Sequence, residues 1–141
     1  MSGLLQLTAV AIGGRAVLID GAPGSGKSSL ALALIDRGAL LVGDDGVALE
    51  ACDGVLYALP APATAGLIEV RNVGLVRLPH AEKAPACLVL QLDSQAPRFI
   101  DAPESCTIMG IALPMVRLWP DSPVLPLRAE MALQSYGLPL G

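Results

Sequence analysis

At 141 residues, the chain is long enough to bury a sizeable hydrophobic core, and we expect one domain spanning residues 1–141. Apolar residues make up 53% of it, yet no stretch approaches the roughly 20 uninterrupted apolar residues of a membrane span. The nine Lys and Arg residues form no basic run and the net charge is −4, which argues against nucleic acid as the main partner. The N-terminus lacks the basic segment of a secretory signal, so we expect neither secretion nor membrane insertion.

The cysteine and histidine content limits the possible chemistry further. Cys52, Cys87 and Cys106 are odd in number and show no C-x-x-C spacing, so we expect buried free thiols in a reducing cytoplasm. His80 is the only histidine and follows Pro79 in a polar stretch that is typical of a loop. A histidine-based catalytic triad or a zinc site is therefore nearly excluded.

The N-terminal segment has the pattern of a β-hairpin. Residues 4–12 are predicted to form one strand, and residues 15–20 return as its partner. Gly13-Gly14 between them is a two-residue turn signal. The strand that ends at Asp20 is therefore expected to pair antiparallel with the first strand.

Residues 21–28, Gly-Ala-Pro-Gly-Ser-Gly-Lys-Ser, match the phosphate-loop pattern G-x-x-x-x-G-K-[ST] without a mismatch. A β-prone apolar run precedes the loop. A predicted helix follows it over residues 28–37, with Gly38 as the stop. This order of strand, loop and helix is the context in which the motif binds phosphate, whereas a glycine-rich turn that matches by chance would lack it.

The chemistry of such a loop explains its spacing. Glycines let the backbone wrap around phosphate oxygens, and the loop amides and the helix N-terminus then point at the anion. Lys27 is expected to reach the β- and γ-phosphates, and the Ser28 hydroxyl to ligate Mg²⁺. The expected nucleotide-binding residues are Gly21, Ala22, Pro23, Gly24, Ser25, Gly26, Lys27, Ser28 and Ser29.

A pair of carboxylates follows the next predicted strand, residues 39–42. Asp44 and Asp45 stand where a Walker B carboxylate would hold Mg²⁺, and a parallel crossover would carry them to the phosphate loop. One could hold metal while the other takes a proton from an attacking hydroxyl. The alternative is an Asp-Asp-Gly turn between two strands, and the upstream phosphate loop favours the site.

The middle of the chain is predicted to be strand-rich. Residues 47–59 read as a hairpin that turns at residues 52–54, and a Pro/Ala loop follows at 60–64. In the apolar stretch 66–76, Glu69 and Arg71 alternate with apolar residues, so on one strand both would project from the same face. They could form a surface ion pair, or act as a Mg²⁺ carboxylate and a phosphate-binding guanidinium. The residues alone leave this open.

The second half carries fewer signals. We expect a charged loop at 79–85, a central strand at 86–93, a short edge strand at 98–100, and one or two strands at 105–113 and 115–118. Residues 127–136 have a moderate helical pattern that Gly137 ends. Arg128 in this helix is more plausibly a structural charge than a site residue.

Together, the phosphate loop, the Asp pair seventeen residues after Lys27 and the segment 69–74 resemble the catalytic domain of the HPr kinase/phosphorylase family. In particular, it resembles the short forms from alphaproteobacteria that lack the family's N-terminal domain. The resemblance covers about residues 6–76. The family's Ala-Asp-Asp corresponds to residues 43–45, and its signature Glu-x-Arg-Gly-x-Gly corresponds to residues 69–74.

The resemblance implies an α/β fold, a single P-loop kinase domain related to phosphoenolpyruvate carboxykinase, with a strand-rich mixed sheet and few helices. It also implies a cytoplasmic, usually hexameric enzyme that uses ATP and Mg²⁺ to phosphorylate a serine of HPr, the carrier protein of the sugar phosphotransferase system, and that can run the reverse phosphorolysis. The roles that follow are metal binding by Ser28 with Asp44 or Glu69, and charge stabilisation by Arg71. Asp45 would be the base, although spacing cannot separate it from Asp44.

Two residues depart from the family pattern. Gln6 stands near a family histidine and cannot carry a proton at neutral pH, and Asn72 replaces the first signature glycine. If that glycine serves a positive φ, Asn is the residue that tolerates it best. These departures keep two alternatives open, a catalytically weak nucleotide-binding regulatory module and a small-molecule kinase.

Overall fold

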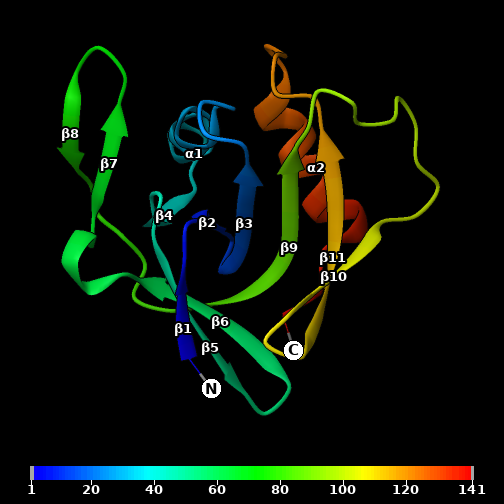
Figure 1. The fold of residues 1–141 in the computed structure, drawn as a ribbon, viewed down its shortest axis with the longest axis horizontal. Coiled ribbons are helices and arrows are strands. Elements are labelled where there is room, and N and C mark those ends of the chain that lie inside the picture. The colour runs from blue at the N-terminus through cyan, green and yellow to red at the C-terminus, as the bar shows by residue number, and fades with distance from the viewer. Residues whose placement is uncertain (1, 141) are drawn as a thin grey trace.

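The computed structural model describes residues 2–140, which form a mixed sheet with two α-helices (Figure 1). The strands are β1 Ser2–Leu5, β2 Thr8–Ile12, β3 Arg15–Gly21, β4 Leu40–Gly43, β5 Val47–Cys52, β6 Val55–Pro60, β7 Leu67–Val70, β8 Gly74–Arg77, β9 Ala84–Leu92, β10 Glu104–Ile108 and β11 Ile111–Leu118. The helices are α1 Lys27–Asp36, α2 Leu125–Tyr136 and a short 3₁₀ turn, Pro62–Thr64. This is the strand-rich α/β fold with few helices that the sequence predicts.

β9 is the central strand, as expected. On one side it pairs in parallel with β3. On the other side it pairs antiparallel with β6 at its beginning and in parallel with β11 toward its end. From β3 the sheet continues through β2 to β4, with both pairings antiparallel. β3 and β4 therefore run in the same direction, with β2 between them. Since β9 and β11 are parallel to β3, all four of these strands end at the same side of the sheet, which we call its carboxyl edge. Ligands bind at this edge in open α/β sheets.

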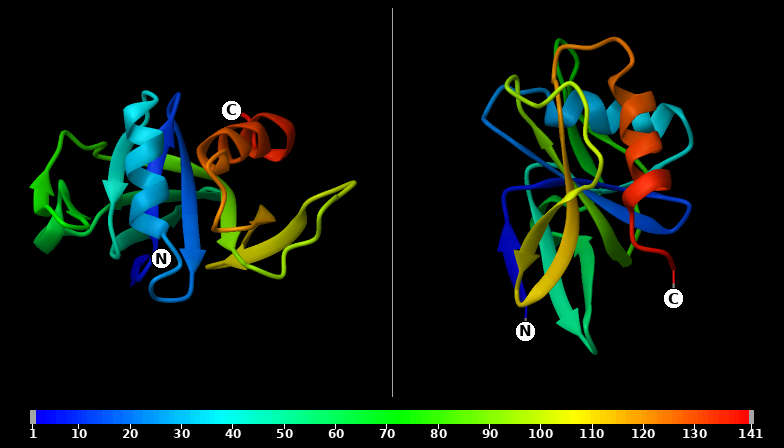
Figure 2. Two further views of the ribbon diagram at one scale, coloured as in Figure 1. Left: turned by 90° about the horizontal axis from the view of Figure 1, so that it is seen from above. Right: turned by 90° about the vertical axis from the view of Figure 1, so that its right-hand side faces the viewer.

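Aliphatic side chains fill both faces of the central strands. On β3, Val17 and Ile19 pack with residues of α1 and α2, whereas Ala16 and Leu18 pack with residues of β5 and β6 on the other face. All four are fully buried. The two helices lie side by side on the first face (Figure 2), and Arg37 donates to Glu130 at 2.8 Å across their contact. Alternate burial along a strand matches the two-residue period of β structure.

Several predicted boundaries are wrong. The strand expected over residues 4–12 is two strands, because β1 leaves β2 and pairs with β5. Residues 98–100 form no strand and belong to a loop between β9 and β10. The one or two strands expected at residues 105–113 and 115–118 form a hairpin that turns at Met109 and Gly110, which both have positive φ, and Pro114 lies inside β11.

The phosphate-loop helix and the C-terminal helix are confirmed within one or two residues. α1 begins at Lys27 and ends before Arg37, and α2 begins two residues earlier than predicted and stops at Gly137. The hairpins that turn at residues 13–14 and 53–54 are also confirmed. Neither helix in the described part of the chain has the length and apolar character needed to cross a membrane.

Candidate active site

The phosphate loop closes between the end of β3 and the start of α1. Gly24 and Gly26 have φ values of 80° and 101°, which a side chain would strain. Gly21 needs its missing side chain for another reason, since a Cβ there would lie 2.5 Å from the Ser25 hydroxyl oxygen. That hydroxyl is buried and has no hydrogen-bond partner among residues 2–140. The loop conformation therefore requires glycine at these three positions.

The N-terminus of α1 presents free backbone donors to this loop. Gly26 occupies the N-cap position, without a side-chain cap, and accepts the first helical hydrogen bond from Leu30 N–H at 2.9 Å. The N–H groups of residues 27–29 consequently have no acceptor inside the helix. No acidic side chain lies in this first turn. Three unpaired N–H groups at the positive end of a helix dipole make a site for an anion.

Asp44 lies beside this helix terminus and is held from three sides. Its Oδ1 accepts hydrogen bonds from the Ser28 hydroxyl at 2.5 Å and from the Thr8 hydroxyl at 3.2 Å. Its Oδ2 accepts the backbone N–H of Glu69 at 2.9 Å. Both carboxylate oxygens are thus occupied and fixed in direction. Residues 44–46 form the turn from β4 to β5, and the Asp44 side chain also joins the phosphate-loop helix to β2 and β7.

Thr8 is a residue that the sequence analysis missed. It is the one fully buried polar side chain of the described core, and its hydroxyl also accepts the backbone N–H of Asp45 at 3.2 Å. Its position as a polar residue at the start of an otherwise apolar strand was the available signal. The hydroxyl fixes the first turn after β4, so it orients both aspartates from the neighbouring strand.

Asp45 is in a different environment from Asp44. Its side chain is 71% exposed, and its only charged contact in the described structure is Lys27 Nζ, 4.0 Å from Oδ1. It has a φ of 52° and lines the cleft together with Asp44, but only the Asp44 carboxylate bonds to Ser28 of α1. The Lys27 side chain is only 15% exposed. The ammonium group of the phosphate loop therefore lies beside an exposed carboxylate and is itself largely shielded from water.

The segment 66–76 is a hairpin and not the single strand expected. Val73 N–H donates to Val70 O at 3.0 Å, and Asn72 between them has a φ of 71°. Arg71 therefore lies in a turn and does not share a strand face with Glu69. Asn72 therefore stands at a position of positive φ, the condition under which the sequence analysis names asparagine as the best-tolerated replacement for glycine.

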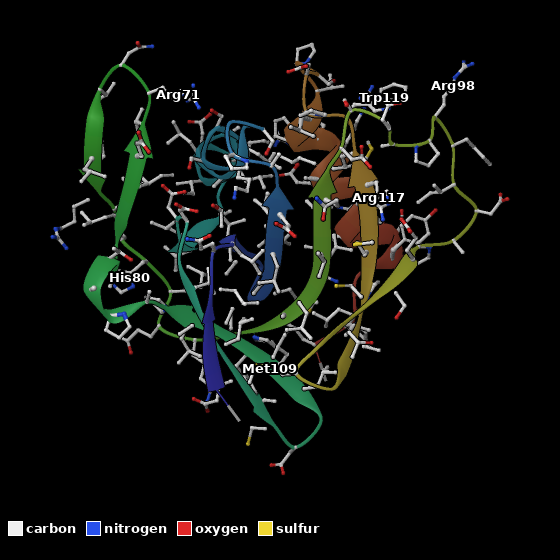
Figure 3. The ribbon with its side chains drawn as sticks, in the orientation of Figure 1. Arg71, His80, Arg98, Met109, Arg117 and Trp119 are labelled. Atoms are coloured by element: carbon white, nitrogen blue, oxygen red, sulfur yellow. The ribbon has the colours of Figure 1, made fainter. Side chains whose placement is uncertain are left out.

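The hairpin nonetheless brings both side chains to the site. Glu69 and Arg71 line the same cleft as the phosphate loop, and the Arg71 side chain extends from the hairpin toward α1 (Figure 3). Both are exposed. Glu69 reaches Asp44 through its backbone N–H, and its carboxylate makes no hydrogen bond among residues 2–140.

These groups surround a cleft of about 690 Å³, a size typical of small-ligand sites. The lining also includes Gln6, which is exposed, and Asp20, whose Oδ1 accepts the N–H of Gly21 at 2.8 Å. No cluster of three or more His, Cys, Asp or Glu side chains within residues 2–140 could hold a metal ion by itself. The cleft residues from the sequence-predicted set are Gly21, Pro23, Gly24, Gly26, Lys27, Ser28, Ser29, Asp44, Asp45, Glu69 and Arg71.

Other candidate residues lie outside the cleft. The Arg128 guanidinium stacks 5.7 Å from the Trp119 ring centre, which is the structural role favoured by the sequence. His80 lies in the connection between β8 and β9, forms a bridge with Leu41 and packs against Gly66. The expectation of buried thiols holds for Cys87 and is wrong for Cys52, which is exposed at the end of β5.

Comparison with known proteins identifies the family. A model of the HPr serine kinase C-terminal domain family matches residues 4–81, more than half of the chain. This stretch holds the phosphate loop, the Asp pair and the β7–β8 hairpin. The chain belongs to the HPr serine kinase C-terminal domain family.

Relatives in this family are similar to different shares of the chain. An HPr kinase/phosphorylase from Clostridium novyi is 46% identical over 66 residues, which are 47% of this chain and 22% of the relative. One from Streptococcus thermophilus is 34% identical over 122 residues, 77% of this chain and 40% of the relative. The chain therefore spans less than half of the length of these relatives.

A solved structure of the family matches nearly the whole fold. The HPr(Ser) kinase/phosphatase from Coxiella burnetii superimposes with a TM-score of 0.83 at 26% identity. The match covers 94% of this chain and 88% of that chain. The likeness extends to the C-terminal half, where the sequence resemblance fades.

Proposed function

We propose that this protein is an ATP- and Mg²⁺-dependent protein serine kinase that acts on HPr, and that the same groups serve the reverse phosphorolysis. One observation carries the proposal. The Ser28 hydroxyl of the phosphate loop and the Asp44 carboxylate after β4 are in contact at 2.5 Å, in one cleft with Lys27 and Asp45. Membership in the HPr serine kinase C-terminal domain family and the names of its relatives support the choice of HPr as substrate.

The phosphate-binding part of the mechanism belongs to residues 21–29. The N–H groups of residues 27–29 and the loop amides bind phosphate oxygens, and Lys27 neutralises their charge. Because these donors are fixed before the ligand arrives, they stabilise charge on the transferring group without reorganisation. The mechanism requires no covalent intermediate on the protein, since positioning and electrostatics supply most of phosphoryl-transfer catalysis.

The donor set at Ser28 and Asp44 fits Mg²⁺. This ion prefers oxygen ligands and takes one or two from protein, with water and substrate phosphates completing an octahedron. A hydroxyl and a carboxylate already in contact offer this partial set, and Glu69 at the cleft wall is the further candidate. Ser28 and Asp44 would hold the ion there, and it would supply positive charge that neutralises the phosphate oxygens. Thr8 and the Glu69 N–H hold the Asp44 carboxylate in the orientation that this requires.

The different surroundings of the two aspartates favour different roles, metal binding for Asp44 and proton transfer for Asp45. Asp44 has hydrogen bonds on both oxygens, which suits a fixed ligand and not a proton acceptor. Asp45 is exposed and has free oxygens, so it can accept the proton of an incoming serine hydroxyl and return it in the reverse direction. Arg71, at the mouth of the cleft, stabilises negative charge on the phosphoryl group as it moves. Family resemblance supports a homo-oligomer, a hexamer, in the cytoplasm.

The test is transfer of labelled phosphate from ATP with Mg²⁺ to purified HPr, with HPr lacking its acceptor serine as the negative control. We expect labelling of wild-type HPr, and loss of labelling with Lys27→Ala and with Asp45→Asn. Binding of ATP without transfer to any HPr would contradict the kinase proposal. It would favour the regulatory module that Gln6, an uncharged side chain lining the cleft, first suggested.

A further inference from the structure

A second groove continues from the phosphate loop away from the aspartates. It has a volume of about 490 Å³ and lies between the N-terminal half of α1 and residues 120–126, the segment that leads from β11 into α2. Both walls rise at the carboxyl edge of the sheet (Figure 1). Gly24, Gly26 and Ser29 line the groove and also the main cleft. The main cleft and the groove are therefore adjacent, and the phosphate loop forms their shared border.

The chemistry of the groove differs from that of the main cleft. Its α1 wall is made by Leu30 and Ala33, and prolines of residues 120–126 make much of the opposite wall. Asp121 and Ser122 are the polar side chains on that opposite wall. An aliphatic and proline-lined slot with one carboxylate is suited to a flat, weakly polar ring that is attached to hydroxyl groups.

The opposite wall is held in place before any ligand binds. The Trp119 indole N–H donates to Ala96 O at 2.7 Å, and the Arg128 guanidinium covers its ring. Ser122 O accepts Leu125 N–H at 3.1 Å, and its hydroxyl accepts Val124 N–H at 3.2 Å, which fixes the turn into α2. A preformed wall lowers the entropy cost of binding.

The positions of the charged residues give the bound molecule a direction. Lys27, Ser28 and both aspartates line the main cleft and do not line the groove. The reacting end of a polyphosphate must lie near those groups. The end of the polyphosphate that carries the nucleoside then extends past Ser29, which lines both hollows, and enters the groove.

We propose that this groove binds the nucleoside part of the nucleotide, with the base packed between Ala33 and the prolines and the ribose hydroxyls bound by Asp121. This inference rests on the proposed use of a nucleoside triphosphate. It adds a binding contribution that no residue of the phosphate loop supplies. Arg71 lines both hollows and would lie over the junction between the nucleoside and the reacting phosphates.

The experiment compares binding of Mg²⁺-ATP and Mg²⁺-tripolyphosphate by calorimetry. Ala33→Trp fills the groove, and Leu32→Trp places the same side chain on the neighbouring exposed position outside it. We expect Ala33→Trp to weaken ATP binding by about tenfold or more and to leave tripolyphosphate binding within about twofold, because only the nucleoside loses its site. Leu32→Trp should change neither, and retained tripolyphosphate binding shows that the fold is intact.

A second variant addresses the ribose. Asp121→Asn should weaken ATP binding and leave binding of 2′,3′-dideoxy-ATP unchanged, since that analogue has no ribose hydroxyls for Asp121 to bind. The inference is overturned if wild type binds ATP no more tightly than tripolyphosphate, or if Ala33→Trp and Asp121→Asn leave ATP binding unchanged. If wild type binds neither ligand, the proposed nucleotide-dependent function fails as well, and the two failures are thereby distinguished.

Discussion

The hydroxyl of Thr8 lies 3.2 Å from Oδ1 of Asp44, and it lies 3.2 Å from the backbone nitrogen of Asp45. It donates to the first group and accepts from the second. One fully buried side chain on β2 therefore fixes the turn in which both aspartates stand. Substitution of this buried residue should consequently affect the site.

Thr8→Val keeps the shape of the side chain and removes both hydrogen bonds. We expect the free energy of unfolding to fall by about 1–3 kcal/mol, because the Asp45 N–H loses its acceptor. Phosphate transfer should fall further than nucleotide binding, since the two carboxylates are no longer oriented. Urea denaturation and the transfer assay measure the two effects.

Thr8→Ser is the matched control, because serine retains the hydroxyl and loses only a methyl group. It should keep most of the transfer activity. If Thr8→Val were as active and as stable as the wild type, the hydroxyl would have no orienting role.

The second prediction separates the two aspartates. Asp45→Asn should lower transfer by about 10²–10⁴-fold and leave nucleotide binding nearly unchanged, because only the proton acceptor is lost. Asp44→Asn should instead raise the Mg²⁺ concentration needed for half-maximal nucleotide binding, since an amide is a weaker ligand than a carboxylate. A titration of Mg²⁺ at fixed ATP distinguishes them. The opposite assignment of base and ligand would require the two variants to exchange these behaviours.

The parts of the site that the sequence predicted are those whose geometry is local. The phosphate loop, its glycines and the helix after it lie in one continuous stretch of sequence. A short sequence motif is therefore enough to predict how they are arranged. The positions of Arg71 and Thr8 depend on partners elsewhere in the chain. Arg71 follows a strand whose pattern continues past it, and the apolar alternation gave no sign that the chain reverses at Asn72.

The N-terminal strands illustrate the same limit. Residues 4–12 are uniformly apolar apart from Gln6 and Thr8, and nothing local marks the point where β1 leaves β2. The division arises because β1 pairs with β5, some 45 residues later in the chain. The turn at Met109 was also not predictable, because a bulky residue rarely adopts the φ of 51° that Met109 has in this turn.

The third prediction concerns the turn at Asn72, whose φ of 71° is left-handed. Asn72→Gly should keep or improve the order of the β7–β8 hairpin. Asn72→Val should weaken the hairpin by about 1–3 kcal/mol, because a β-branched residue is strained in this conformation. Hydrogen exchange at the Val73 N–H, which bonds Val70 O at 3.0 Å, reports this local change. Equal exchange rates in the two variants would show that the turn tolerates any residue.

The fourth prediction uses the unequal environments of Cys52 and Cys87. Cys52 is exposed, whereas Cys87 is 2% exposed inside β9 and its Sγ lies 3.4 Å from Pro85 O. Ellman's reagent should therefore label Cys52 rapidly in the folded protein. It should label Cys87 only as the protein unfolds, so that thiol serves as a probe of global opening.

The same burial makes stability depend on alkaline pH. Desolvation raises the pKa of the Cys87 thiol above its ordinary value of 9.0, against a smaller lowering by Arg15. The unfolded chain releases this proton first as the pH rises. The contribution of Cys87 to stability is thus complete below the unfolded pKa and is lost as the pH rises through the folded pKa. Cys87→Ala lacks the thiol, so its free energy of unfolding should decline less steeply above about pH 9 than that of wild type. The two proteins share their lysines and tyrosines, so parallel curves in urea denaturation between about pH 8 and pH 10.5 would show that Cys87 is not protected by the fold.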